Sequence, residues 1–129
     1  MLTNDILQTL KSYTANMQTP VTFVLQTGEH RKREELVEFL TRLSGVSDQL
    51  ELVERDAGLR SPVSFSLEAG GRPTGIVFSG IPGGHEFNSL ILAVLQASGS
   101  EIKLDESLKA LVAGVREPLH FEVFISLSC

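Results

Sequence analysis

The chain has 129 residues, of which 42% are hydrophobic and 21% charged, with a formal net charge of −5. These values are typical of one compact folded domain and unlike a disordered segment. The acidic balance argues against a nucleic-acid-binding protein, which usually carries a basic patch. The one basic cluster, residues 30–33, is followed at once by two glutamates, so we interpret it as a solvated helix start.

No signal peptide and no apolar stretch of the roughly 18 residues needed to cross a bilayer is recognisable, so we expect no membrane contact. The single cysteine, Cys129, cannot form a disulfide within the chain. A reducing cytoplasm is therefore the expected compartment.

The chain opens with a predicted helix and strand. Apolar residues between positions 6 and 17 recur at helical spacing, with Thr3 or Asn4 as the candidate N-cap, and Pro20 ends this helix. Residues 21–26 are rich in β-branched and aromatic side chains and predict a buried strand.

A second helix and a second strand follow. Apolar residues at helical spacing within 36–43 predict an amphipathic helix that ends at Ser44-Gly45. Residues 50–54 predict a strand. Strand, helix and strand in this order predict a right-handed crossover between parallel strands.

A β-hairpin is predicted next. In residues 63–67 apolar side chains alternate with serines, as in a strand with one solvated face. The turn-rich stretch 69–75 and the apolar run 76–78 complete the hairpin. Pro62 has two interpretations: a proline tolerated at the first strand position, where its missing N–H is not needed, or a proline after a cis peptide bond.

Residues 87–95 predict a helix that is apolar nearly all round and therefore needs cover on several sides. The first hundred residues thus predict an α/β unit of order α-β-α-β-β-β-α, with a mixed sheet and helices on both faces. Residues 105–115 then predict another helix, and residues 119–127 another strand. Helix, proline and strand repeat the opening of the chain, so we interpret residues 1–100 as one complete unit and 101–129 as the start of a second.

Cys129 directly follows this last predicted strand. Redox folds place their attacking cysteine at such a position, with a second cysteine in Cys-x-x-Cys spacing. No metal-ligand spacing connects Cys129 with the histidines, so we expect no metal site. No Gly-x-Gly-x-x-Gly motif occurs either, so no dinucleotide cofactor is expected in this chain.

Several segments resemble the N-terminal domain of the flavoprotein subunit of bacterial alkyl hydroperoxide reductase. They are Gly83-Gly84-His85-Glu86-Phe87 with Ser89-Leu90, the ending Ser126-Leu127-Ser128-Cys129, Pro62 before a strand, and Leu10-Lys11-Ser12-Tyr13. The resemblance extends over essentially the whole chain. It implies two thioredoxin-like folds in tandem, of which the first has no dithiol and the second carries Cys-x-x-Cys. In such folds a cis-proline stands where Pro62 lies.

The resemblance also implies a function. The family's dithiol takes electrons from a module that binds FAD and NADH, and it then reduces the disulfide of a peroxiredoxin partner. Cys129 would be the first cysteine of the pair, and Glu86 would shuttle a proton beside it. Alternatively, Glu86 only occupies a helix start, where a negative charge suits the helix dipole.

The present chain lacks the second cysteine, so we expect it to be inactive alone. FAD and NADH are expected only in the longer family protein. The alternative function is a free-standing thioredoxin-like domain that binds proteins without catalysis. Because residues 119–127 predict an apolar strand without its own sheet, they should dock on the first unit or pair two chains into a homodimer.

Overall fold

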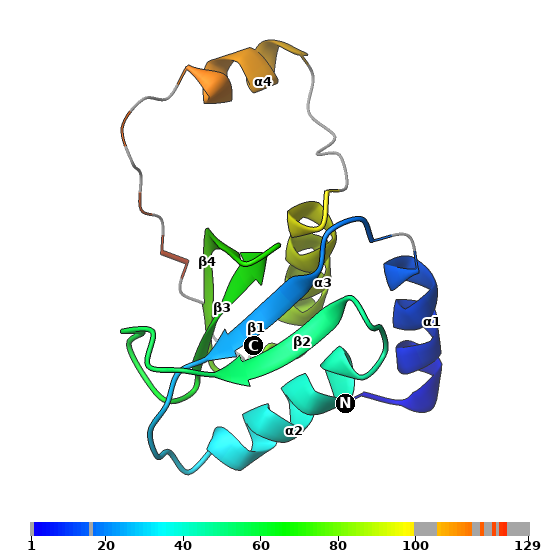
Figure 1. Cartoon of the computed structure of the whole chain (residues 1–129), viewed down its shortest axis with the longest axis vertical. Coiled ribbons are helices and arrows are strands. Elements are labelled where there is room, and N and C mark those ends of the chain that lie inside the picture. The colour runs from blue at the N-terminus through cyan, green and yellow to red at the C-terminus, as the bar shows by residue number, and fades with distance from the viewer. Residues whose placement is uncertain are drawn as a thin grey trace.

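The computed structural model describes residues 2–15, 17–99 and 106–114, together with residues 117, 120, 122 and 123. The elements, drawn in Figure 1, are α1 (Asn4–Thr14), β1 (Val21–Leu25), α2 (Arg33–Ser44), β2 (Leu50–Glu54), β3 (Ser64–Ala69), β4 (Arg72–Ser79), α3 (His85–Ala97) and α4 (Glu106–Ala113). This order confirms the predicted α-β-α-β-β-β-α unit and the helix after it. None of the described helices is long and apolar enough to span a bilayer. The predicted strand 119–127 falls mostly outside the described residues and stays a prediction.

The four strands form one mixed sheet in the order β2-β1-β3-β4. Strand β1 pairs in parallel with β2, and Val21 lies opposite Leu50. Strand β1 also pairs antiparallel with β3, which in turn forms the hairpin with β4. The predicted parallel crossover and antiparallel hairpin are therefore both confirmed.

One face of the sheet supplies the core. Alternate residues of a strand point to the same face, so Phe23 and Leu25 of β1 face the same way as Phe65 of β3, which lies opposite Leu25. All three are fully buried. The rings of Phe23 and Phe65 meet edge to face with centroids 6.0 Å apart, and Phe78 of β4 stacks on Phe65 at 5.4 Å. Burying each such side chain contributes about 1.5–3 kcal/mol.

Helices α1, α2 and α3 all pack against this core face. Leu10 of α1, Leu43 of α2 and Val94 of α3 surround a small apolar cavity together with Phe23. Phe39 of α2 also meets a phenylalanine of α3, with ring centroids 6.1 Å apart. The cover expected on both faces differs in this respect, because residues 55–63, which connect β2 to β3, form no helix.

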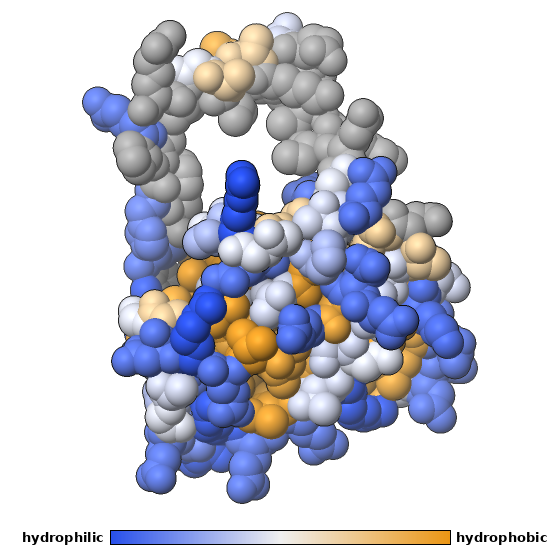
Figure 2. All heavy atoms as spheres, viewed as in Figure 1, coloured by the Kyte–Doolittle hydropathy of each residue, from blue (hydrophilic) through white to orange (hydrophobic). Residues whose placement is uncertain are grey.

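The opposite sheet face is formed by small and β-branched side chains. By the strand register it carries Val24 of β1, Val53 of β2, Ser66 of β3 and Val77 of β4. Val77 is 49% exposed. Figure 2 shows hydrophobic residues among hydrophilic ones over the middle of the molecule, where Figure 1 has the strands.

The β3–β4 hairpin is tighter than predicted. The turn consists of Gly70 and Gly71 alone, whose φ angles of 59° and 80° suit a two-residue turn that requires positive φ at both positions. Strand β4 therefore begins at Arg72, inside the stretch expected to form the turn. Pro73 is accommodated because β4 is an edge strand, and the pairing of β3 with β4 shifts register beyond it.

The expected solvated face of β3 is wrong at Ser64, which is fully buried. Its hydroxyl lies 2.8 Å from the hydroxyl oxygen of Ser79 and 3.1 Å from that of Ser61. A buried hydroxyl costs little when it is hydrogen-bonded. These partners explain why a serine is stable at a position where alternation alone predicted water.

Candidate functional site

In a thioredoxin-like fold the dithiol lies after the first strand of the parallel pair, facing the turn before β3. In this chain that place is occupied by the loop that begins at Gln26 and by the turn at Pro62, and it contains no thiol. Gly28 has a φ of 126°, and a Cβ there would lie only 2.8 Å from Cγ of Pro62. Only glycine fits this conformation and this close approach. The position is thus closed by direct contact between the two loops.

The prediction of a cis-proline at position 62 is wrong. Among the described residues no peptide bond is cis, so the bond between Ser61 and Pro62 is trans. The N–H of Ser64 donates to the carbonyl oxygen of Ser61 at 3.0 Å, which closes a β-turn with Pro62 in its second position. Proline suits that position because its fixed φ matches the turn. Strand β3 begins only at Ser64, so Pro62 does not open the strand either.

Arg33, the first residue of α2, holds the two loops together. Its Nη1 donates to the carbonyl oxygens of Gln26 and Pro62, the latter at 2.7 Å. Its Nη2 lies 3.4 Å from a carboxylate oxygen of Glu54, and its side chain is only 15% exposed. The solvated cluster predicted at residues 30–33 is therefore confirmed for 30–32, which are exposed, and wrong for Arg33. Nothing in the sequence distinguished Arg33 from its basic neighbours.

Gln26 fixes the loop that connects β2 to β3. The buried Oε1 of Gln26 accepts hydrogen bonds from the backbone N–H groups of Ala57 at 2.9 Å and Leu59 at 3.0 Å. Its Nε2 donates to Oδ1 of Asp56 at 2.8 Å. This bond and one from the N–H of Gly58 lower the pKa of Asp56. The side chain of Gln26 thus gives backbone groups the partners that a helix would otherwise provide.

Glu86 lies in the first turn of α3, where its N–H donates to the carbonyl oxygen of Gly83 at 3.2 Å. Its side chain is partly buried, and this burial raises the pKa of the Glu86 carboxyl. A carboxyl with a raised pKa holds a proton more readily near neutrality, as a proton shuttle must. Cys129 lies outside the described residues, so the predicted pairing of Glu86 with Cys129 stays a prediction.

The part of the chain that the structure describes has no group of three or more His, Cys, Asp or Glu residues able to hold a metal ion. It also offers no fit for FAD or NADH. The cavity among α1, α2 and α3 has an apolar wall that includes Leu10, Phe23 and Val94. Such a wall presents no donors for a pyrophosphate, which needs backbone N–H groups or basic side chains. The redox chemistry of this chain therefore rests on its one thiol and on acid–base groups.

No family model matches the chain. It is 43% identical over all 129 residues to the alkyl hydroperoxide reductase flavoprotein AhpF of Staphylococcus aureus (strain Mu50), and 41% identical to AhpF of Staphylococcus epidermidis. In both comparisons the chain is covered completely. The chain spans about a quarter of the length of these curated relatives, 25% in each case.

Solved structures agree with the sequence comparison. The NTD_N/C domain of alkylhydroperoxide reductase AhpF from Enterococcus faecalis (V583) superimposes with a TM-score of 0.80 at 28% identity, over 91% of this chain and 62% of that one. AhpF of the same organism, as a C503A mutant, gives 0.77 at 30% identity, over 89% of this chain and 61% of that one.

A protein disulfide oxidoreductase from Aeropyrum pernix K1 shares the fold, with a TM-score of 0.69 at 20% identity, over 88% of this chain and 55% of that one. The fold is therefore thioredoxin-like, as predicted. By sequence over its full length and by fold, the chain belongs with the N-terminal domains of the AhpF family of alkyl hydroperoxide reductases.

Proposed function

We propose that this chain is the N-terminal redox and docking module of a peroxiredoxin reductase. The observation that carries the proposal is the 43% identity to AhpF over every residue of the chain. In the longer protein, a module that binds FAD and NADH supplies electrons to a Cys-x-x-Cys, which passes them to the disulfide of a peroxiredoxin. The natural setting of this chemistry is a reducing cytoplasm, where a lone thiol persists.

In this proposal residues 1–100 form the thiol-free unit and residues 101–129 begin the unit that carries the dithiol. Helix α4 provides the first element of that second unit. Cys129 then supplies the attacking thiol. The closed contact between Gly28 and Pro62 supports the division of labour, because the first unit has neither a thiol nor an accessible position for a partner disulfide.

The chemistry requires two thiols. The thiolate of the first cysteine attacks one sulfur of the partner disulfide, which forms a mixed disulfide and releases the other sulfur as a thiolate. The second cysteine then attacks the mixed disulfide, releases the second partner thiolate and leaves an intramolecular disulfide, so two electrons have moved to the partner. Cys129 alone can perform only the first of these steps, and a carboxyl such as Glu86 can take up or return the proton.

A test follows from this limit. The reduced chain is mixed with an oxidised bacterial peroxiredoxin, and the products are separated by non-reducing electrophoresis and mass spectrometry. We expect a covalent adduct through Cys129 and no catalytic turnover. Cys129→Ser should abolish the adduct. Absence of any adduct with the unmodified chain, under conditions in which a thioredoxin reacts, would overturn the proposal.

The closed, thiol-free position favours a second candidate, a thioredoxin-like domain that binds a partner without redox chemistry. The same experiment separates the two. A binding domain keeps its affinity for the peroxiredoxin in Cys129→Ser, as measured by calorimetry, and forms no adduct. The redox module depends on Cys129 for the covalent product.

A further inference from the structure

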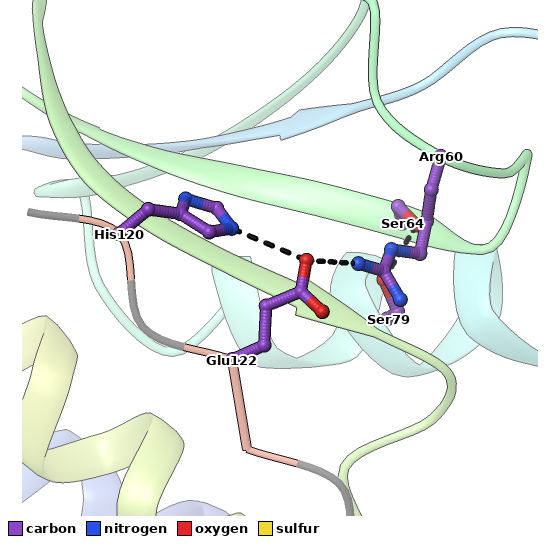
Figure 3. Close-up of polar contacts among 5 residues, drawn as sticks. All are labelled: Arg60, Ser64, Ser79, His120 and Glu122. Carbon is purple, nitrogen blue, oxygen red and sulfur yellow. Dashed lines mark hydrogen bonds and ion pairs between the residues drawn. The ribbon is translucent and has the colours of Figure 1, made fainter.

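The described residues of the C-terminal segment contact the first unit through one arginine. Nη2 of Arg60 lies 2.7 Å from Oε1 of Glu122, although the two residues are 62 positions apart in the sequence. Nε2 of His120 lies 3.2 Å from the same oxygen. Figure 3 shows the Glu122 carboxylate between the His120 ring and the Arg60 guanidinium.

Arg60 projects from a part of the chain that is itself firmly held. It lies in the 55–63 loop, which Gln26 fixes by accepting from Leu59, the residue directly before Arg60. On the other side of Arg60, the carbonyl of Pro62 accepts from Arg33. A guanidinium on a fixed loop loses less conformational freedom when it forms an ion pair than one on a mobile loop.

The geometry of the segment agrees with an extended chain held along one side. Successive side chains of an extended chain point to opposite sides, so His120 and Glu122 share one side and Val123 takes the other. Both polar residues meet at the Glu122 carboxylate, whereas Val123 is 85% exposed. The hydrogen bond from His120 and the charge of Arg60 lower the pKa of Glu122, so its carboxylate is ionised at neutral pH.

We propose that Arg60 is a positioning residue: by pairing with Glu122, it holds the segment that leads to Cys129 against the thiol-free unit. This gives the thiol-free unit a task of its own within the proposed function, on which the inference rests. The polar side of the segment is held by Arg60, and the apolar side, represented by Val123, is left open for the remaining elements of the second unit. It also favours docking of residues 119–127 on their own chain over pairing with a second copy.

The expected effect is moderate, because the Arg60 and Glu122 side chains remain 53% and 40% exposed. Exposed ion pairs typically change a local equilibrium by a small factor, and a charge reversal adds repulsion to the loss of attraction. We therefore expect Arg60→Glu to accelerate amide hydrogen exchange at residues 117–123 by roughly three- to fivefold. Exchange in β1 and β3 should not change.

The decisive experiment is a charge exchange. Arg60→Glu and Glu122→Arg should each accelerate exchange at residues 117–123, and the double variant should restore it to the starting rate. Arg31→Glu is the matched control, since Arg31 is an exposed arginine in the loop before α2 and should leave the segment unchanged. If Arg60→Glu lowers the melting temperature, Glu122→Gln provides the same test from the segment's side.

A nitroxide attached to Cys129, the only thiol in the chain, provides a second readout. We expect its electron paramagnetic resonance spectrum to report greater mobility in Arg60→Glu and recovery in the double variant. Unchanged exchange and mobility in Arg60→Glu and Glu122→Gln, or failure of the double variant to recover, would overturn the proposal. Neither readout uses thiol exchange, so a failed peroxiredoxin assay would count against the proposed function alone.

Discussion

Replacing Gly28 by alanine tests whether the thiol-free position is closed by its contact with Pro62. At a φ of 126° an alanine is strained, which costs about 1–3 kcal/mol. The new Cβ would also lie 2.8 Å from Cγ and 3.3 Å from Cβ of Pro62, and overpacking of this kind costs about 1–3 kcal/mol. We therefore expect Gly28→Ala to lower the free energy of unfolding by about 3 kcal/mol.

Urea denaturation followed by circular dichroism measures this change. For a slope of about 2 kcal/mol/M, the midpoint should fall by roughly 1.5 M. Gly58→Ala is the matched control, since Gly58 has a φ of 70° but no heavy atom within 4 Å of its added Cβ, so only about 1–2 kcal/mol is expected. In a Pro62→Ala background, which removes Cγ, Gly28→Ala should cost less. A Gly28→Ala midpoint equal to that of Gly58→Ala would show that the contact with Pro62 has no energetic weight.

Three further predictions concern charged groups. Arg33→Met should lower the free energy of unfolding by about 2 kcal/mol in urea titration, because two carbonyls lose a charged donor; Arg31→Met should change it by less than about 0.5 kcal/mol, and an equal loss in both would contradict the role of Arg33. The lowered pKa of Glu122 means that its contribution is present above the ordinary pKa of 4.5 and is lost as pH falls through the lower folded value. Exchange at residues 117–123, corrected for intrinsic rates, should accelerate only below about pH 4.5, and loss of protection already at pH 6 would oppose this. The raised pKa of Glu86 has the opposite sign: its ionisation destabilises the fold as pH rises through the folded value, so Glu86→Gln should stabilise the protein at pH 7 and not at pH 3. Equal effects at both pH values in thermal melts would contradict it.

Local patterns predicted the elements well where the chain gives clear start and stop signals. Strand β2 begins and ends as expected at residues 50 and 54. Thr3, one of two candidate caps, accepts a hydrogen bond from the N–H of Ile6 at 3.3 Å and begins α1. The hairpin was less predictable because glycine and proline are turn residues only by tendency: Gly70 and Gly71 form the turn, whereas Pro73 is accommodated in an edge strand.

The candidate site depends on contacts between residues far apart in the sequence, and no periodicity reveals these. Arg33 reaches Pro62 across 29 positions, and Arg60 reaches Glu122 across 62. Arg33 resembled its solvated basic neighbours in the sequence, because its burial is decided by the loop that folds over it. The trans peptide bond before Pro62 was likewise set by the surrounding turn, which the sequence left open between two interpretations.

The proposed function requires Cys129 to supply one half of a dithiol. To test this requirement, the fully reduced chain is titrated into an excess of oxidised peroxiredoxin, and both the adducts and the released thiols are counted by mass spectrometry. We expect at most one adduct and one released peroxiredoxin thiol per chain, with none in Cys129→Ser. Release of two peroxiredoxin thiols per chain without a lasting adduct, or any release by Cys129→Ser, would show that Cys129 does not have this role.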